Sequence, residues 1–210
     1  MLGEGGYGAA HLVVGKEGFN RNKTLVAKIN FSADRGAMAL LETGILRQID
    51  HPNVVKTVEQ FHSENGPISI LELCVYGSLY KQLVTLVDMN KELSAFPEKL
   101  VIKILHDLCS GLQECHRHGI LHGDIKTDNC LIDKTMNFKL ADFGISLLVD
   151  EDGQLSLEGI RGSKGWMAPE TMDRILTKAS DIFGLGAVIY SVCTIVQRKN
   201  KTPPYASAHF

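Results

Sequence analysis

The spacing of the apolar residues changes between residues 73 and 78, and this change most constrains the fold. Before it, apolar residues form short runs broken by turn-forming residues, in residues 9–14 (AAHLVV), 24–30 (TLVAKIN) and 68–73 (ISILEL). Runs of this kind predict antiparallel strands. Between them, residues 34–50 repeat apolar residues at three- and four-residue steps up to the sequence HPN, which predicts one helix. The first part of the chain therefore predicts a small sheet interrupted by a helix.

Helical periodicity dominates the rest of the chain. Residues 97–119 place apolar side chains along one face of a predicted helix that Gly119 ends. Two short strand-like runs follow, residues 129–133 (NCLID) and 138–142 (FKLAD), and then a polar loop. The nearly all-apolar residues 181–195 predict a helix inside the core. The whole pattern predicts an α+β fold.

Length and charge exclude several classes of protein. With 210 residues, 44% of them hydrophobic, the chain is long enough to bury a substantial core as one large domain or a two-lobed one. The 22 basic and 24 acidic residues nearly cancel, which argues against nucleic acid or an acidic membrane surface as a partner. Five cysteines without CxxC spacing predict reduced, buried thiols in a cytoplasmic protein. The N-terminal residues lack the features of a signal peptide, and no segment is long and apolar enough to predict a membrane span.

Three glycines near the N-terminus form the pattern GxGxxG in residues 3–8 (GEGGYG). An ordinary glycine-rich turn is the simpler interpretation, because this pattern alone is weakly specific. A Rossmann site needs a helix directly after the glycines, whereas a strand-like run follows here, and the chain has no GxxxxGK[ST] sequence. The glycines are therefore expected to cap a hairpin whose backbone N–H groups can lie over phosphates.

Lys28 lies in the middle of a predicted strand, between apolar neighbours. Alternation along a strand favours an outward-facing, solvated lysine. The alternative is an inward-facing lysine, because Lys28 shares a strand face with Val26, and it would then need an anionic partner. Glu42, on the apolar side of the following predicted helix, is the candidate, although it is also compatible with an ordinary surface position.

Residues 122–129 (HGDIKTDN) place two acids, a lysine and an amide between two apolar segments. A solvated turn accounts for them if they are considered alone. Two further segments have equally simple interpretations, since Asp142 in ADFG can start a turn, and Pro169 and Glu170 in WMAPE can begin a helix. Their order and spacing along one chain are very improbable by chance, which favours a shared chemical role.

Over residues 2–205, the chain resembles the eukaryotic protein kinase family, serine/threonine type. The segments that carry the resemblance are, in chain order, LGEGGYGAA (2–10), LVAK (25–28), LLETGIL (40–46), LELC (71–74), HGDIKTDN (122–129), ADFG (141–144), GWMAPE (165–170) and DIFGLG (181–186). The resemblance implies a bilobal α+β fold with a small antiparallel β-lobe, residues 1–73, and a hinge, residues 74–77. A mainly helical C-terminal lobe, incomplete relative to the family, would occupy residues 78–210.

The resemblance also implies roles for the polar residues. Asp124 would act as catalytic base, and Lys126 would neutralise charge on the transferred phosphoryl group. Asn129 and Asp142 would hold Mg²⁺. Lys28, paired with Glu42, would bind the ATP phosphates. His122 is expected to pack in the core near Phe143 rather than to act as a base.

An ATP site is implied at the cleft between the lobes. Adenine would lie between Leu2, Ala10 and Val26 on one side and Leu131 on the other, with Leu71 at the rear. The hinge backbone around Glu72 and Cys74 would provide hydrogen bonds to adenine. The hairpin over the phosphates would consist of Gly3, Glu4, Gly5, Gly6, Tyr7 and Gly8.

Some positions decide between subclasses or depart from the family pattern. Lys126 together with Ser163 resembles serine/threonine kinases rather than tyrosine kinases. Gly123 replaces an arginine that pairs with a phosphorylated activation loop, so activation is expected not to depend on loop phosphorylation. Thr57 replaces an apolar residue, and Ala10 replaces a valine. Glu170 lacks the arginine that it pairs with in the family.

The leading hypothesis is a protein serine/threonine kinase that uses ATP and Mg²⁺ and acts on a protein substrate. The alternative is a scaffold that keeps the fold, binds ATP and signals by protein contact. A kinase for small molecules is a third possibility, which GSKGWMAPE in residues 162–170 disfavours, because in the family this segment shapes a groove for a protein substrate.

Overall fold

A computed structural model describes residues 3–5, 8–30, 49–63, 66–88, 97–149, 154–156 and 162–194. Most of the helix predicted over residues 34–50 lies outside the described residues. Leu2, Gly6, Tyr7 and Glu42 also lie outside them, so their predicted roles stay predictions.

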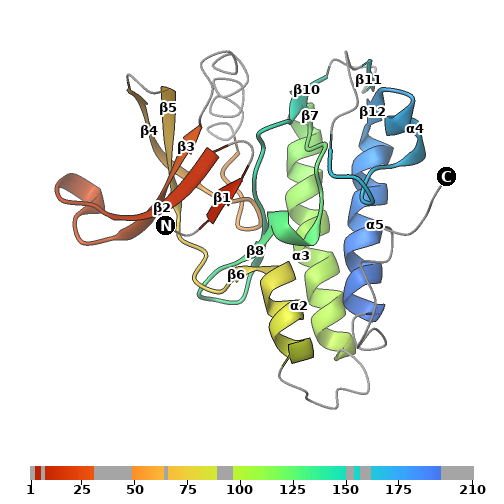
Figure 1. Cartoon of the computed structure of the whole chain (residues 1–210), viewed down its shortest axis with the longest axis horizontal. Coiled ribbons are helices and arrows are strands. Elements are labelled where there is room, and N and C mark those ends of the chain that lie inside the picture. The colour runs from red at the N-terminus through yellow and green to blue at the C-terminus, as the bar shows by residue number, and fades with distance from the viewer. Residues whose placement is uncertain are drawn as a thin grey trace.

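The N-terminal half forms one antiparallel five-stranded sheet, as predicted (Figure 1). The strand order is β1-β2-β3-β5-β4. The strands are β1 (Gly3–Gly5), β2 (Gly8–Val14), β3 (Thr24–Asn30), β4 (Thr57–Ser63) and β5 (Gly66–Glu72). A short 3₁₀ helix, η1 (Gly18–Asn20), lies in the connection from β2 to β3. The α+β fold with an antiparallel N-terminal sheet is therefore confirmed.

The two faces of this sheet differ in character. On one face, Leu25, Ala27 and Ile70 form a small apolar cluster. Their neighbours along the strands point to the opposite face, where Lys28 of β3 is directly across from Ser69 of β5. The side chain of Lys28 is only 16% exposed, so the interpretation as an outward, solvated lysine is wrong.

Three polar side-chain atoms of the sheet are buried without a hydrogen bond to any residue that the structure describes: Thr57 Oγ1, Gln60 Nε2 and Ser69 Oγ. Thr57 is one of the positions at which the sequence departs from the family pattern. An unpaired buried hydroxyl costs desolvation free energy without a compensating bond.

We predict that Thr57→Val raises the free energy of unfolding by about 1 kcal/mol, because it removes this unpaired hydroxyl and keeps the branched shape. Thr135→Val is the matched control, since the Thr135 hydroxyl donates a 2.8 Å hydrogen bond to Asp133 and its loss should destabilise the protein. Urea unfolding at equilibrium measures both changes. Equal destabilisation by the two substitutions would contradict the prediction.

Among the described residues, the second half contains four α-helices and several short strands (Figure 1). The helices are α2 (Leu79–Asp88), α3 (Glu98–Arg117), α4 (Pro169–Met172) and α5 (Lys178–Thr194). The predicted runs at 129–133 and 138–142 form β8 (Cys130–Ile132) and β9 (Phe138–Leu140), which join β6 (Gly77–Ser78) in a sheet ordered β6-β8-β9. Two further pairs are β7 (Ile120–Leu121) with β10 (Leu147–Leu148), and β11 (Gln154–Ser156) with β12 (Ile175–Thr177).

The main hydrophobic core lies between α3, α5 and the β8–β9 pair. Ile104, Leu108 and Leu112 of α3 are buried there, together with Leu185 and Val188 of α5. The predicted end of α3 is confirmed, because Gly119 adopts φ +69° and a Cβ there would lie 2.8 Å from the Val149 carbonyl oxygen. In the part of the chain that the structure describes, no helix is long and apolar enough to cross a membrane.

Two predictions about burial are partly wrong. α5 buries one face against the core, but Ile182, Phe183 and Tyr190 on its other side are exposed, although the helix is almost wholly apolar. Composition shows that a helix is apolar but not how many of its faces are covered. All five cysteines are free, and Cys109 and Cys193 are exposed rather than buried, because each faces outward on its helix.

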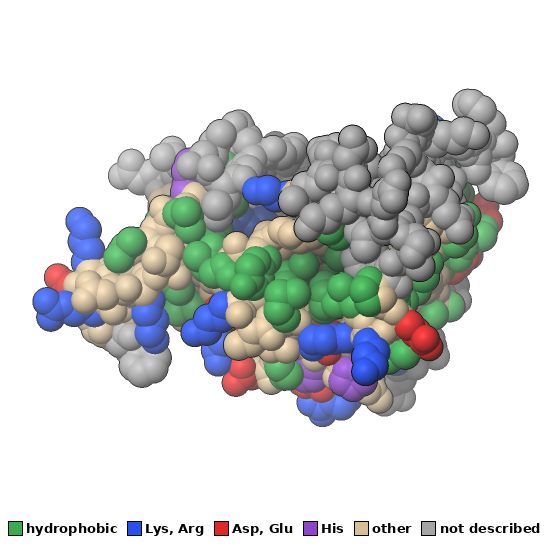
Figure 2. Space-filling model, turned by 90° about the horizontal axis from the view of Figure 1, so that it is seen from below, with side chains coloured by type: hydrophobic (Ala, Val, Ile, Leu, Met, Phe, Trp, Pro, Cys, Tyr) green, Lys and Arg blue, Asp and Glu red, His purple; other side chains and the backbone are tan. Residues whose placement is uncertain are grey.

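Surface charge on one face agrees with the balanced composition. Seen from below, Lys and Arg side chains are scattered among apolar and acidic ones and do not form one continuous basic surface (Figure 2). The absence of a nucleic-acid partner stays a prediction.

Candidate active site

The segment HGDIKTDN connects β7 to β8 and contains the 3₁₀ helix η3 (Thr127–Asn129). It is not a solvated turn, because His122, Thr127 and Asn129 are buried. The His122 ring lies 4.7 Å from the ring of Phe143, which confirms the expected core position. Its Nε2 is 3.1 Å from the carbonyl oxygen of Ala141, so the ring joins this segment to the residue before Asp142.

A buried carboxylate holds the start of this segment. Asp181 of α5 accepts hydrogen bonds from the backbone N–H groups of His122 and Gly123, each at 2.9 Å, and its Oδ2 lies 2.8 Å from His116 Nε2. The sequence pattern did not predict a role for Asp181. The available signal was an acid at the start of an otherwise apolar helix, since a buried acid needs partners.

Asp124, Lys126 and Asn129, to which the family resemblance assigns roles in one catalytic segment, lie close together. Asp124 Oδ2 accepts hydrogen bonds from Lys126 Nζ at 2.7 Å and Asn129 Nδ2 at 3.1 Å, while Oδ1 accepts one from the Ser163 N–H at 2.8 Å. Lys126 Nζ also lies 2.5 Å from Ser163 Oγ. The Asp124 side chain is 11% exposed, so it is oriented by these three donors and only partly open to solvent.

Asp142 is adjacent to this group. The N–H of Ala141 donates a 2.9 Å hydrogen bond to the carbonyl oxygen of Asn129, which joins the two segments. Lys28 Nζ, from the N-terminal sheet, lies 2.8 Å from Asp142 Oδ1. Partial burial alone would raise the pKa of Asp142, but the charge of Lys28 and its hydrogen bond lower the pKa below the ordinary value. Asp142 is therefore anionic at neutral pH.

The residues at this position fit a magnesium ion. Asn129 uses its amide nitrogen to bind Asp124, and its Oδ1 accepts no hydrogen bond from the described residues, so this oxygen is available as a ligand. Asp142 supplies an anionic oxygen, and oxygen ligands are those that Mg²⁺ prefers. Within the described ranges there is no cluster of three or more His, Cys, Asp or Glu side chains that could hold a metal.

The predicted adenine pocket is apolar. Leu71 and Leu131 pack against a buried cluster of Val55, Cys74 and Ala141. Val26 is directly across from Leu71 in the sheet. Burial raises the pKa of the Cys74 thiol to about 12, so this thiol is a packing group rather than a nucleophile. The Cys74 N–H donates no hydrogen bond to another described residue, which leaves it available to a ligand.

The glycine-rich segment forms the expected hairpin. β1 pairs with β2 in the register Gly3 with Ala10, Glu4 with Ala9 and Gly5 with Gly8. In turn, Ala10 is directly across from Lys28 in β3. The hairpin is thus attached to the strand that carries the lysine.

The segment after Asp142 is held by strand pairing and apolar contacts. β10 pairs with β7, and the Val149 N–H donates a 2.8 Å hydrogen bond to the Gly119 carbonyl oxygen. Leu121 and Leu176 are buried together against Leu147 and Val149. Further along, β11 pairs with β12.

Gly123 lies beside the same apolar cluster. It has φ +76°, and a Cβ there would lie 3.3 Å from Leu176 Cδ2 and 3.8 Å from Ile145 Cδ1. The position at which the family carries a phosphate-binding arginine is thus lined by apolar side chains.

A small hollow is lined in part by Asp124. Its lining includes Ser163, Trp166 and Thr171. Next to it, Glu170 Oε1 accepts a 2.8 Å hydrogen bond from Ser180 Oγ.

Comparison with known proteins agrees with the geometry. The family model for the protein kinase domain matches residues 1–206. The chain is 32% identical over 209 residues to Cell division control protein 7 of Schizosaccharomyces pombe, with 97% of this chain and 18% of that protein covered. It is 34% identical over 206 residues to Cytokinesis protein sepH of Aspergillus terreus, with 97% of this chain and 14% of that protein covered. It is 28% identical over 221 residues to Serine/threonine-protein kinase Nek2 of Homo sapiens, with 98% of this chain and 46% of that protein covered. The chain therefore spans less than half of the length of each of these relatives, and it belongs to the eukaryotic protein kinase family.

Proposed function

We propose that this chain is the catalytic domain of a protein serine/threonine kinase, which transfers the γ-phosphoryl group of ATP to a hydroxyl group of a protein. The observation that carries the proposal is the convergence of Asp124, Lys126 and Asn129 with the Lys28–Asp142 ion pair. A scaffold that only binds protein has no need for this arrangement, because it concentrates several charged groups at a partly buried site.

Each residue has a distinct task in this proposal. Asp124 accepts the proton of the substrate hydroxyl while the hydroxyl oxygen forms a bond to the γ-phosphorus of ATP. The bond between the γ-phosphorus and the oxygen that bridges it to the β-phosphate breaks, and ADP leaves. Lys126, between Asp124 and Ser163, stabilises negative charge on the transferred group. Lys28 positions the phosphates. Asn129 and Asp142 would hold Mg²⁺, which neutralises phosphate charge when it is bound.

The class of acceptor is inferred from two features. Lys126 and Ser163 form one hydrogen-bonded group with Asp124, as expected for the serine/threonine type. The relative Nek2 carries serine/threonine-protein kinase in its name. The lobe boundaries and the cytoplasmic location stay predictions.

Activity is proposed to be independent of phosphate on the loop between Asp142 and Glu170. The support is the apolar surrounding of Gly123 and the Leu121–Leu176 cluster, which supply no cation for a phosphate. We predict that phosphatase treatment leaves kcat unchanged within about twofold, because a phosphate group without a basic partner does not order the loop that carries it. Mass spectrometry of the loop before and after treatment is the control. Loss of activity together with loss of a loop phosphate would contradict this prediction.

The proposed function is tested by combining nucleotide binding with transfer. Calorimetry should show binding of ATP that depends on Mg²⁺, and labelled γ-phosphate should appear on serine or threonine of a generic protein substrate. Binding without transfer would favour the scaffold alternative. Absence of both, with folded protein, would exclude the kinase and the nucleotide-binding scaffold.

A further inference from the structure

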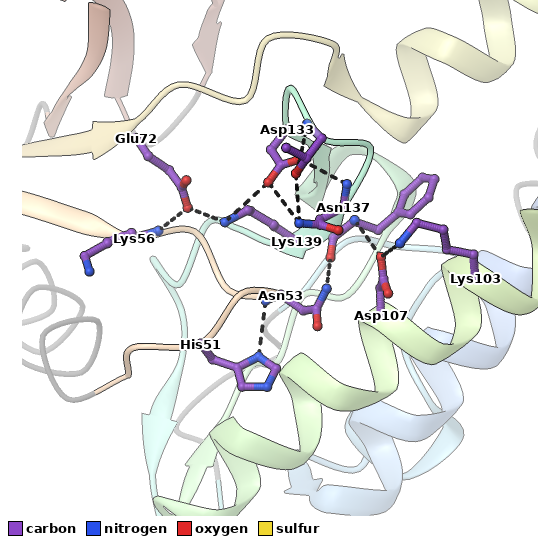
Figure 3. Close-up of polar contacts among 11 residues, drawn as sticks. His51, Asn53, Lys56, Glu72, Lys103, Asp107, Asp133, Asn137 and Lys139 are labelled. Carbon is purple, nitrogen blue, oxygen red and sulfur yellow. Dashed lines mark hydrogen bonds and ion pairs between the residues drawn. The ribbon is translucent and has the colours of Figure 1, made fainter. Parts of the chain in front are cut away.

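A group of charged residues lies behind the hinge, outside the proposed catalytic group (Figure 3). We call Glu72, Asp133 and Lys139 the hinge-side cluster. Glu72 ends β5, Asp133 lies in the turn between β8 and β9, and Lys139 lies in the middle of β9. The cluster thus joins the N-terminal sheet to the strand that leads to Asp142.

Lys139 is a buried cation, with a side chain 8% exposed. Its Nζ lies 2.7 Å from Glu72 Oε1 and 3.8 Å from Asp133 Oδ2. A lysine at this depth needs anionic partners, and removing one partner from a buried ion pair is strongly unfavourable. The short distance identifies Glu72 as the main partner.

The lysine end of this pair is fixed independently of Glu72. Side chains bind both backbone groups of Phe138, the residue before Lys139. The Phe138 N–H donates a 3.0 Å hydrogen bond to Asp107 Oδ2. The Phe138 carbonyl oxygen accepts a 3.0 Å hydrogen bond from Asn53 Nδ2, and Figure 3 labels both of these side chains. Asp133 is fixed by hydrogen bonds from Thr135 and Asn137. Burial alone would raise the pKa of Asp133, but these bonds lower it, so the carboxyl is anionic.

The Glu72 end holds the hinge backbone. Glu72 Oε1 accepts a 2.8 Å hydrogen bond from the backbone N–H of Lys56, in addition to the one from Lys139 Nζ. The backbone N–H of Glu72 donates a 3.0 Å hydrogen bond to the carbonyl oxygen of Lys56. Residue 72 is therefore held through both its backbone and its side chain. This fixes the direction of the peptide group that follows it.

The peptide segment after Glu72 leads to Cys74, which packs with residues of the predicted adenine pocket. Adenine presents an amino donor beside a ring-nitrogen acceptor, so it needs a carbonyl group and an N–H group at a set spacing. The Cys74 N–H is available, and the Cys74 side chain packs with Leu71 and Leu131. Guanine presents the opposite order, an acceptor beside a donor, and a rigid backbone rejects it.

We propose that Lys139 is a positioning residue for nucleotide specificity: its ion pair with Glu72 holds the hinge backbone in the orientation that accepts adenine and rejects guanine. Lys139 reaches the nucleotide only through Glu72 and touches no reacting atom. The inference rests on the proposed function, but only on its nucleotide-binding part.

The test is equilibrium binding of Mg·ADP and Mg·GDP to the folded chain, measured by calorimetry. Lys139→Gln should weaken ADP binding on the order of tenfold, in the range of couplings within one polar network, and change GDP binding much less. The preference for ADP over GDP should therefore fall. Lys56→Gln is the matched control, because it removes an exposed ion pair with Asp50 and keeps the backbone N–H that binds Glu72.

A second variant keeps the test valid if Lys139→Gln does not fold. Glu72→Gln leaves Lys139 paired with Asp133 and should lower the ADP preference in the same direction. The proposal would be overturned if the binding of both nucleotides weakened equally, or if the preference for ADP over GDP equalled that of the Lys56→Gln variant. Wild-type protein that binds ADP but transfers no phosphate would contradict the kinase activity alone, whereas protein that binds no nucleotide would overturn both.

Discussion

Replacing Asp124 by asparagine is expected to lower kcat by about 10²–10⁴-fold, the usual contribution of a positioned general base. Asparagine keeps the size of the side chain and an oxygen that can accept from the Ser163 N–H, but it cannot take a proton from a hydroxyl group. The KM for ATP should change little, because Asp124 lies among Lys126, Asn129 and Ser163 rather than in the apolar adenine pocket. Steady-state transfer to a generic substrate measures both quantities.

The control for this variant is Asp128→Asn, which changes a neighbouring exposed carboxyl in the same segment. Asp128 makes no hydrogen bond to Asp124, so its replacement should leave kcat near the wild-type value. If Asp124→Asn retained wild-type kcat in folded protein, Asp124 would not be the base. An equal loss in both variants would indicate damage to the whole segment rather than loss of a base.

Asp181→Asn is expected to be the most destabilising single change outside the hydrophobic core. Asp181 is 2% exposed, accepts hydrogen bonds from two backbone N–H groups and lies beside the ring of His116. A hydrogen bond to a charged group contributes about 1.5–3 kcal/mol to stability. Asparagine turns one acceptor into a donor that faces an N–H group. We therefore expect a loss of about 3 kcal/mol in the free energy of unfolding. Activity should fall as well, because the segment carrying Asp124 loses its anchor.

Urea unfolding and kcat, measured on the same preparations, check this prediction. Asp173→Asn is the matched control, since Asp173 is exposed at the end of α4 and caps it through its backbone N–H. Equal stability of the two variants would show that the Asp181 hydrogen bonds contribute little. A stability loss with unchanged kcat would show that Asp181 supports the fold without positioning Asp124.

Residues that are close in sequence were the most predictable part of the site. Asp124, Lys126 and Asn129 lie within one eight-residue segment, and the family resemblance assigned them to one catalytic group. The strands that contain residues 9–14 and Lys28 followed from short apolar runs, and the hairpin followed from the glycines that precede the first of them. The family resemblance then supplied the order of these segments in space.

Contacts between distant residues were not predictable in the same way. Asp181 binds backbone groups 58 and 59 residues earlier in the chain, and Lys139 binds Glu72 across 67 residues. Nothing in the local pattern of β9 indicates that Lys139 points inward, because a strand lysine more often faces solvent. The exposure of Cys109, Cys193 and the outer side of α5 likewise depends on which elements pack nearby, which composition does not contain.

The most direct test of the central claim is a single-turnover measurement. The protein is saturated with Mg²⁺ and labelled ATP, mixed with matched peptides that differ only in a central Ser, Thr, Tyr or Ala, and quenched over time. We predict first-order transfer of label to the Ser and Thr peptides, with none to Ala and little to Tyr. Saturated nucleotide binding with no label in any peptide above the Asp124→Asn level would contradict the assignment as a protein kinase domain with catalytic activity.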